Sequence, residues 1–292
     1  MILVAGGSGT LGSVVVGHLA ALGLPLRVLT RQQHWTGPVA DPPVEVVVGD
    51  VRDPAILDQA LAGATEVVSC IQGFGGRDPQ GLGAVDVGGN KMLVDAAHAH
   101  GIVHLVLLSV VGASATSPMP LFRAKFRAEE ALRASSVPRT IIRASAFMET
   151  WLQLVGDPLV ERGRTTVYGR GENPINFVAV RDVAQAVERA VLDRQPSDRT
   201  ISVTGPDNLT FDRFAELVLD TTGRQGRVSH VPRPALRALA IALRPIKPMI
   251  AQQVKAAVVM DTEDMTAPTT GCATPLTTVI SDRYGTGASQ GA

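Results

Sequence analysis

The first twelve residues restrict the fold more than any other stretch of the chain. An apolar segment, residues 1–5, runs directly into glycines at positions 6, 7, 9 and 12, and apolar residues then recur at helical spacing. This order is typical of a dinucleotide-binding fingerprint, in which the backbone comes close to a pyrophosphate and a helix N-terminus faces its charge. A purely structural turn is the alternative. We expect the turn to contact the cofactor through Gly6, Ser8, Gly9, Thr10, Leu11 and Gly12.

Composition limits the size of the fold and the classes of partner. The 292 residues, 45% of them hydrophobic, suffice for one large α/β domain or for one with a small appendage. A formal net charge of zero gives no general preference for nucleic acid or for an anionic membrane surface. The chain contains no uninterrupted run of about 20 apolar residues, so we expect no membrane span. The two cysteines lie far apart in the sequence, and the first predicted strand begins at residue 2, which leaves no room for a leader. We therefore expect a cytoplasmic protein with free thiols.

A second strand indicates which dinucleotide is bound. Residues 25–30 are predicted to form this strand, which ends at Arg31, about 20 residues past the glycines, where the fold places the adenosine ribose. An acid at this point would bind the 2′-hydroxyl of NAD, whereas an arginine can pair with a 2′-phosphate. We therefore expect NADP(H) to be favoured over NAD(H). An ordinary surface arginine is the alternative.

The third and fourth strands add the adenine side and the edge of the ligand crevice. Residues 44–48 form the expected third strand, and Asp50 follows where the adenine would rest; a turn-stabilising aspartate is an equally weighted alternative. Residues 66–71 are almost continuously apolar, as in a buried parallel strand, and open into a glycine-rich segment at the carboxyl edge. We expect further cofactor contacts from Asp50, Val51, Ile71, Gln72 and Gly73.

A lysine occupies an unusual place on the predicted helix 121–134. Leu121, Lys125, Ala128 and Leu132 share one stripe at helical spacing, and charged residues occupy the opposite side. A cation on an inward face is costly without a partner, and a cofactor ribose and phosphate would supply one. Snorkelling, with the aliphatic stem buried and the ammonium in water, is the alternative.

Several motifs occur in order along the chain. They are the glycines at 6, 9 and 12, Gly49-Asp50, Ser109 after a fifth strand at 104–109, Lys125 with Glu129 one turn on, the sixth strand 140–143, and segments around 168–171, 176–184 and 201–206. Together they resemble the atypical branch of the short-chain dehydrogenase/reductase superfamily, and in particular the NmrA-like NAD(P)-binding proteins, over roughly residues 1–225. The resemblance implies an α/β fold, a doubly wound parallel sheet (Rossmann) with a smaller C-terminal substrate domain, and NADP(H) as the usual ligand.

The same resemblance assigns parts of the chain to these domains. Residues 1–145 would form the dinucleotide-binding domain, rejoined by about 172–205. Residues 146–171 and 206–292 would form a small substrate-binding or lid region with a flexible tail. An apolar wall for a flat substrate, or simple packing, would account equally well for Phe147, Met148 and Trp151.

The resemblance also implies catalytic roles. Ser109 would lie near the nicotinamide and polarise the acceptor oxygen, and Lys125 would hydrogen-bond the nicotinamide ribose or relay a proton. The tyrosine that supplies the proton in the superfamily stands four residues before the lysine, and that position here is Leu121. Tyr168 and Tyr284 lie elsewhere in the chain. Ordinary alcohol and ketone chemistry therefore lacks its usual proton donor in this chain.

We expect an NADPH-dependent oxidoreductase that transfers hydride to a small, largely apolar acceptor, such as a quinone, an enone or an aromatic carbonyl. The alternative is a non-catalytic NADP(H)-sensing regulator or assembly factor. Phe122 and Phe126 are candidates for a homodimer contact, although packing explains them as well. We expect no metal site, because the histidines at 98, 100 and 104 have no carboxylate or cysteine arranged beside them.

Overall fold

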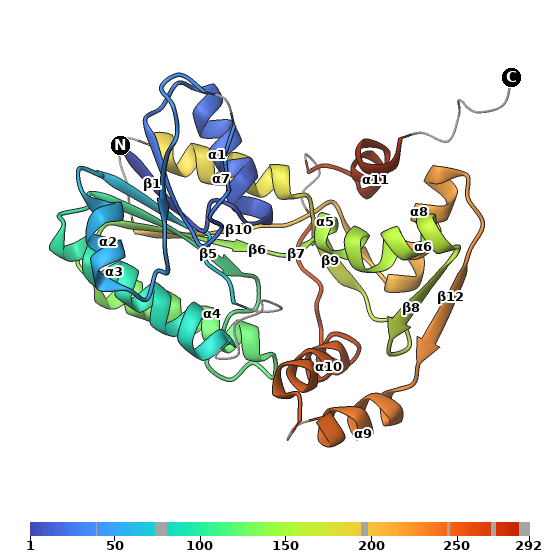
Figure 1. The fold of residues 1–292 in the computed structure, drawn as a ribbon. Helices are drawn as coiled ribbons and strands as arrows, with labels where there is room; N and C mark the ends of the chain where they lie inside the picture. The colour runs from blue at the N-terminus through green and yellow to red at the C-terminus, as the bar shows by residue number, and fades with distance from the viewer. Residues whose placement is uncertain (39, 74–80, 194–197, 244–245, 270–272, 286–292) are drawn as a thin grey trace, which may run out of the picture. The chain divides into compact units, whose positions relative to one another are not determined.

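Two compact units make up the chain in the computed structural model, which describes residues 1–38, 40–73, 81–193, 198–243, 246–269 and 273–285 (Figure 1). The first unit comprises Met1–Ala144 and Val180–Val203, and the second comprises Ser145–Ala179 and Thr204–Ala292. The chain returns to the first unit at Val180, whereas the sequence placed this return near residue 172.

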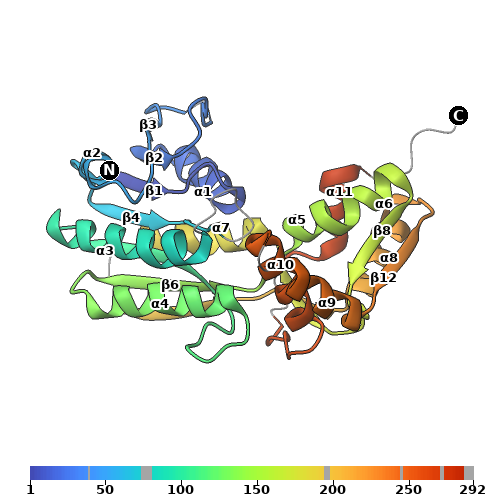
Figure 2. The same cartoon turned by 60° about the horizontal axis from the view of Figure 1, so that its bottom comes forward.

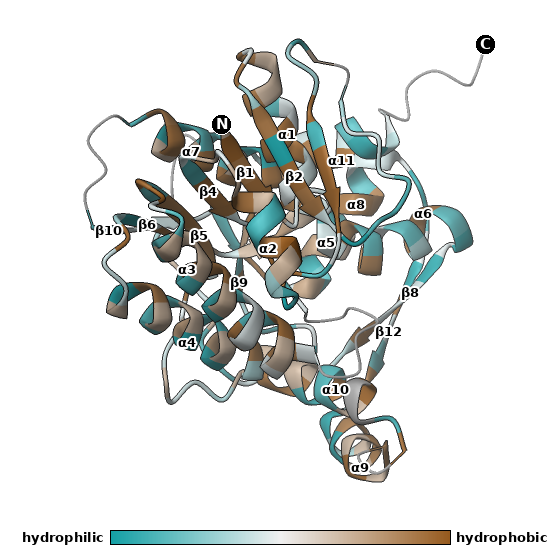
Figure 3. Cartoon of the chain, turned by 60° about the vertical axis from the view of Figure 1, so that its left-hand side comes forward, coloured by the Kyte–Doolittle hydropathy of each residue, from teal (hydrophilic) through white to brown (hydrophobic). Residues whose placement is uncertain are grey.

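A seven-stranded parallel sheet forms the centre of the first unit, in the order β10-β6-β5-β4-β1-β2-β3. Its strands are apolar and largely brown in Figure 3, as expected for strands covered on both faces. The strand order reverses between β1 and β4, and in such sheets the ligand crevice lies at the carboxyl ends on either side of that point. The predicted doubly wound parallel sheet is confirmed. The strands are β1 (Ile2–Ala5), β2 (Leu26–Thr30), β3 (Glu45–Val48), β4 (Glu66–Ser69), β5 (His104–Val110), β6 (Arg139–Ala144) and β10 (Arg199–Val203).

Helices cover both faces of this sheet. Helices α1 (Thr10–Ala21) and α7 (Val180–Leu192) pack together on one face, and α2 (Pro54–Leu61), α3 (Asn90–Ala99) and α4 (Pro120–Ala134) lie on the other (Figures 1 and 2). Alternate strand residues point to each face, so that Leu3, Val67 and Leu105 share one buried core with Leu93 and Leu132. Burial of such side chains is the main source of stability for the unit.

The segment before α3 is not a regular α-helix. Residues Gly83–Gly89 form a π-helical turn, η1, and the regular helix α3 begins only at Asn90. Glycines at 83, 88 and 89 lower the helix propensity of this stretch, which allows the wider turn. A Cβ atom at Gly89 would also lie 2.7 Å from Val51 Cγ1, so this turn packs closely against the loop after β3.

The second unit contains two small sheets and several helices. Strands β7 (Ala146–Phe147), β9 (Ile175–Val178) and β11 (Asp207–Leu209) form one sheet, and β8 (Arg164–Tyr168) and β12 (Arg227–Val231) form the other. The Trp151 and Phe211 rings lie 4.6 Å apart, and Phe177 contacts both Phe211 and Phe214. Trp151 therefore packs within this unit. The helical segments are α5 (Met148–Trp151), η2 (Leu152–Gly156), α6 (Asp157–Arg162), α8 (Phe211–Thr222), α9 (Arg233–Leu243), α10 (Pro248–Met260) and α11 (Leu276–Tyr284).

A helix lies shortly before the expected flexible tail. Helix α11 is tied to the start of α6, because Arg283 makes two hydrogen bonds to the carboxylate of Asp157 and the Tyr284 hydroxyl donates a third at 2.7 Å. The run beyond Asp261 thus contains the helix Leu276–Tyr284, and residues 286–292, where the flexible tail is expected to end, lie outside the described part of the chain. Among the described helices of both units, none is long and apolar enough to cross a bilayer.

The Asp157 anchor predicts a pH-dependent contribution to stability. Hydrogen bonds from Arg283 hold the pKa of Asp157 below its ordinary value of 3.8, so the contribution is present above that value and disappears as the pH falls through the lower folded-state pKa. We expect Asp157→Asn to lower the melting temperature at neutral pH, and the difference from wild type to shrink below a pH of about 4. Thermal unfolding followed by circular dichroism at a series of pH values measures this. A difference that stays constant down to a pH of about 2 would contradict it.

Candidate functional site

The glycine turn after β1 is built so that two stretches of backbone touch. Gly6 has a φ of +80°, in the left-handed region that glycine adopts most easily, and its carbonyl accepts a hydrogen bond from the Gly9 amide at 3.1 Å. A Cβ atom at Gly12 would lie 2.2 Å from the Gly6 carbonyl oxygen, which leaves room only for glycine. The first turn of α1 is thereby held directly against the end of β1.

The N-terminus of α1 faces the carboxyl edge of the sheet without a side-chain cap. Gly9 is its N-cap residue and has no side chain that could accept a hydrogen bond from the helix. The first amides of an α-helix have no acceptor within the helix, and the helix dipole places partial positive charge on them. The amides of Thr10, Leu11 and Gly12 are therefore suited to bind an anion such as a pyrophosphate.

The turn is fixed sideways to the end of β2. The hydroxyls of Ser8 and Thr30 lie 2.6 Å apart, and the Thr30 hydroxyl also accepts a hydrogen bond from the Gln32 amide. Thr30 is buried, whereas the next residue, Arg31, is exposed. The structure thus brings Arg31 to the end of the strand next to the glycine turn, where the sequence placed it.

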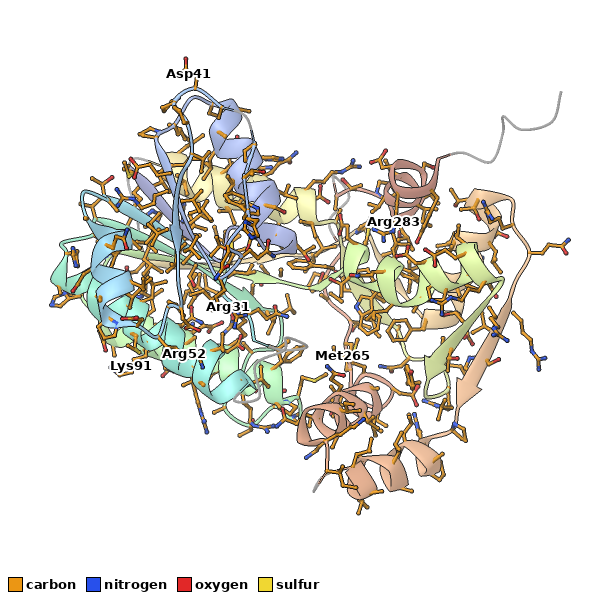
Figure 4. All side chains as sticks on the ribbon, in the orientation of Figure 1. Arg31, Asp41, Arg52, Lys91, Met265 and Arg283 are labelled. Atoms are coloured by element: carbon orange, nitrogen blue, oxygen red, sulfur yellow. The ribbon has the colours of Figure 1, made fainter. Side chains whose placement is uncertain are left out.

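A second arginine, which the sequence did not identify, lies close to Arg31. Arg52 makes two hydrogen bonds to the carboxylate of Asp50, at 2.8 and 2.7 Å, and its amide donates a third at 2.9 Å. These hydrogen bonds from Arg52, and to a smaller extent the charge of Arg31, hold the pKa of Asp50 below its usual value. Figure 4 shows both arginines on the same side of the first unit.

The Asp50 carboxylate therefore stabilises its own turn through Arg52, and its contact with an adenine stays a prediction. The sequence did carry a signal for this pair, because Arg52 follows Asp50 by two residues, which is the spacing of an Asx-turn.

Lys125 is buried, and its inward orientation is confirmed. The side chain is 1% exposed, and Nζ donates a hydrogen bond of 2.7 Å to the carbonyl of Ile71, at the carboxyl end of β4. Nζ also lies 3.2 Å from Oδ1 of Asp86, which is fully buried. The snorkelling alternative is wrong, because the ammonium contacts protein atoms inside the unit and does not reach water.

Asp86 is a buried carboxylate beside Lys125 that the sequence pattern did not indicate. It lies on η1, and its Oδ2 accepts a hydrogen bond of 2.8 Å from the amide of Gly73. Its own carbonyl accepts one from Asn90 Nδ2, and Asn90 in turn accepts one from the hydroxyl of Ser69 at the end of β4. An acid between two valines in a glycine-rich helical run was the available signal, because such a position is normally apolar.

Of the other residues expected at this edge, Ile71 and Gly73 contribute backbone atoms to the Lys125 and Asp86 cluster. Val51 is buried against Gly89, and Gln72 is exposed. The next residues along the loop, 74–80, lie outside the described part of the chain. The structure therefore gathers the ends of β1, β2 and β4 and the lysine of α4 in one unit, as the sequence implied.

Ser109 has a different environment from the one expected. Its hydroxyl is buried and donates a short hydrogen bond of 2.5 Å to Oε1 of Glu129 on α4. Arg143 makes two further hydrogen bonds to the same carboxylate, and Arg133 makes one. The Ser109 proton is thus engaged by a buried carboxylate, and its role in polarising an acceptor stays a prediction.

The Glu129 cluster joins α4 to the ends of β5 and β6. Burial alone would raise the pKa of Glu129, but the hydrogen bonds from Arg143 and Ser109 outweigh it and hold the pKa below the usual value. The carboxylate is therefore charged at neutral pH, and each of its oxygens has a charged or hydroxyl donor. We interpret this cluster as structural.

No tyrosine in the described part of the first unit replaces the one missing at Leu121. Tyr168 is exposed on β8 of the second unit, and Tyr284 is bound to Asp157 there. Phe122 and Phe126 are half-buried, so a homodimer contact stays a prediction. Within the described residues, no three His, Cys, Asp or Glu side chains gather as metal ligands would.

The Glu129 cluster predicts a large difference between two neighbouring glutamates. Glu129→Gln keeps the shape but leaves Arg143 with a weaker partner, and we expect the free energy of unfolding to fall by about 2–3 kcal/mol. Urea unfolding measures this. The exposed Glu130, whose ion-pair partner among the described residues is Arg133, is the matched control, and Glu130→Gln should cost less than about 0.5 kcal/mol. Equal losses for the two variants would show that burial of the cluster contributes nothing.

Comparison with known proteins supports this interpretation of the first unit. The model of the NmrA-like family matches residues 1–276. NAD(P)H azoreductase of Xenophilus azovorans is 27% identical over 227 residues, covering 78% of this chain and 76% of the azoreductase. Photosystem II assembly factor Ycf39 of Cyanophora paradoxa is 26% identical over 231 residues, covering 79% of this chain and 71% of that protein.

A solved structure shows the same fold. The triphenylmethane reductase of Citrobacter sp., complexed with NADP(H), superposes with a TM-score of 0.76, covering 96% of this chain and 99% of that one. Its sequence identity is 21%, so the likeness shows the fold alone. The comparisons thus include both reductases and an assembly factor.

Proposed function

The chain belongs to the NmrA-like family, and from this premise we propose that it is an NADPH-dependent oxidoreductase. It transfers hydride from the nicotinamide to a small, largely apolar acceptor, such as a quinone, an enone or an aromatic carbonyl. The azoreductase among its relatives supports the reaction class, because its name states NAD(P)H as the cofactor.

The observation that carries the proposal is the uncapped N-terminus of α1 above a turn that admits only glycine at position 12. The amides of this first helical turn supply several donors and partial positive charge at the switch point of the sheet. A pyrophosphate is the anion that this arrangement fits best, because the end of β2 and the end of β4 extend on either side of it.

The preference for NADP(H) rests on charge at the end of β2. The residue there is Arg31, an arginine where an NAD-binding site would have an acid, and the carboxylate of Asp50 bonds Arg52. A 2′-phosphate gains a charge-assisted hydrogen bond from an arginine, whereas a 2′-hydroxyl needs an acceptor that this position does not offer.

Lys125 is the residue of this chain best placed to act on the nicotinamide half of the cofactor. Its ammonium is fixed at the carboxyl end of β4, where it would donate to a ribose hydroxyl. The bound dinucleotide supplies the hydride. With Leu121 in the tyrosine position and the Ser109 proton held by Glu129, we expect the proton to reach the acceptor from water. This favours acceptors that take up hydride at a carbon conjugated to an electron-withdrawing group.

The second unit would supply the acceptor pocket, through residues 146–171 and 206–292. We place the protein in the cytoplasm on its sparse use of cysteine. A homodimer through Phe122 and Phe126 remains part of the proposal. The cofactor site itself lies within the first unit and depends on none of these features.

A glycine pair in α1 tests the cofactor site. Gly12→Ala would place a Cβ atom 2.2 Å from the Gly6 carbonyl oxygen, and we expect it to abolish measurable NADPH binding in a fluorescence titration. Gly17 lies in the same helix, and a Cβ atom there would meet no atom within 4 Å outside its own stretch of helix, so Gly17→Ala should bind NADPH normally. The control should also be slightly more stable, by about 0.5–1 kcal/mol, because alanine favours the helix. Normal binding by Gly12→Ala would rule out the proposed pyrophosphate site.

An arginine pair tests the choice of cofactor. We expect Arg31→Ala to weaken NADPH binding by about tenfold, the effect of losing one charge-assisted hydrogen bond, and to leave NADH binding unchanged. Isothermal titration calorimetry with both cofactors measures this. Arg127→Ala, on the exposed side of α4, controls for the loss of one positive charge. An unchanged ratio of the two affinities in Arg31→Ala would remove Arg31 from the site.

A non-catalytic NADP(H)-sensing regulator or assembly factor is the second candidate function. Leu121 and the engaged Ser109 proton favour it, because both remove expected proton donors, and Ycf39 is an assembly factor among the relatives. Oxidation of NADPH in the presence of quinones, enones and aromatic carbonyls, followed by cofactor absorbance, distinguishes the two. Turnover of any acceptor supports the reductase, whereas tight NADPH binding without turnover supports the sensor.

A further inference from the structure

We propose that Asp86 is the positioning residue of the cofactor site, which holds Lys125 as a fixed, charged donor together with the amide of Gly73. This inference rests on the proposed function, because it gives the residue a task at the nicotinamide ribose. Asp86 lies on η1, whereas the other residues proposed for the cofactor site lie on the glycine turn, at the end of β2 and on α4.

The two oxygens of the Asp86 carboxylate have different partners. Oδ2 accepts a hydrogen bond of 2.8 Å from the Gly73 amide, so it fixes the start of the loop after β4. Oδ1 lies 3.2 Å from the Lys125 ammonium but accepts no hydrogen bond from a described residue. The contact between Asp86 and Lys125 is therefore an attraction between charges, without an aligned hydrogen bond.

This arrangement leaves donors of the lysine available. An ammonium has three N–H groups, and the hydrogen bond to the Ile71 carbonyl is the one that the described residues provide. Asp86 stabilises the positive charge without using the remaining donors, which can be directed at a ribose hydroxyl. A neutral residue at position 86 would offer Lys125 no such stabilisation.

Burial makes the charge of Asp86 indispensable to that of Lys125. The two side chains are 0% and 1% exposed, so neither charge is stabilised by water. A buried ammonium without a partner loses its proton readily, because the neutral amine is the better-tolerated form in a low-dielectric surrounding. We infer that the Asp86 carboxylate balances the buried charge of Lys125 and holds its ammonium in place.

The other groups around Lys125 do not replace this carboxylate. Among the described residues, the thiol of Cys70, which follows β4, is a further ionisable group near Lys125. Burial raises the pKa of that thiol to about 12. Glu129, one turn along α4, faces Arg143, Arg133 and Ser109. Asp86 is thus the carboxylate on which the charge of Lys125 depends.

The test compares the pH dependence of NADPH binding in wild type and in Asp86→Asn. We expect the wild-type Kd to be flat between pH values of about 7.5 and 9.5, a range above the titration of the 2′-phosphate. In Asp86→Asn, we expect affinity to be about tenfold lower at the upper end than in wild type, because the buried ammonium has lost its counter-charge and the neutral amine is the form that burial tolerates better. Asp95→Asn is the matched control, since Asp95 is exposed on α3 and pairs with Lys91.

A merely structural role for Asp86 would lower affinity equally at every pH, and that outcome would overturn the proposal. An unchanged Kd with a flat profile in Asp86→Asn would overturn it as well. If wild type itself fails to bind NADPH, the proposed function is wrong, and this is recognised before any variant is made.

The background Lys125→Met keeps the proposal testable if Asp86→Asn alone does not fold. Asp86→Asn should then have no further effect on NADPH affinity or on its pH profile, because the residue through which it acts has been removed. The double variant also lacks the unpaired buried cation. A further loss of affinity in the double variant, relative to Lys125→Met alone, would show that Asp86 does not act through Lys125.

Discussion

The close approach of the Gly6 carbonyl and the Gly12 backbone is the constraint on which the rest of the first unit depends. A methyl group at position 12 would lie 2.2 Å from that carbonyl oxygen, so α1 can pack at this distance only through a glycine. The contact sets the position of the helix N-terminus at the carboxyl edge of β1. The parallel sheet then brings the ends of β2 and β4 beside it, because the strand order reverses at this point.

Helix α4 carries two buried charges that are satisfied in different ways. Glu129 receives hydrogen bonds from Arg133 and Arg143 and from the Ser109 hydroxyl, so its bonding capacity is used within the protein. Lys125, one turn earlier, has an ion-pair partner and one hydrogen bond, and retains donors. A fully satisfied buried charge is a structural element, whereas one that keeps donors at a sheet edge is suited to a ligand.

Whether a polar side chain is fully bonded within the protein or keeps donors for a ligand also matters for catalysis within the NmrA-like family. The relatives include an azoreductase and an assembly factor of similar identity, so family membership by itself does not decide between turnover and binding. In this chain, the groups suited to bind a dinucleotide lie together in the first unit. The groups that would protonate a substrate oxygen are replaced, at Leu121, or engaged, at Ser109. The structure therefore supports cofactor binding more strongly than any particular reaction.

The sequence by itself determined the features that depend on local spacing. The glycine turn, the parallel strands and the inward direction of Lys125 all follow from residues within a few turns of one another. Partners that come from distant segments could not be predicted in this way. Only the tertiary structure showed that Asp86 faces Lys125, that Glu129 takes the Ser109 proton, and that α11 is anchored on Asp157. A one-dimensional pattern indicates which side chains are buried, but the charges that balance them are decided by packing between elements far apart in the chain.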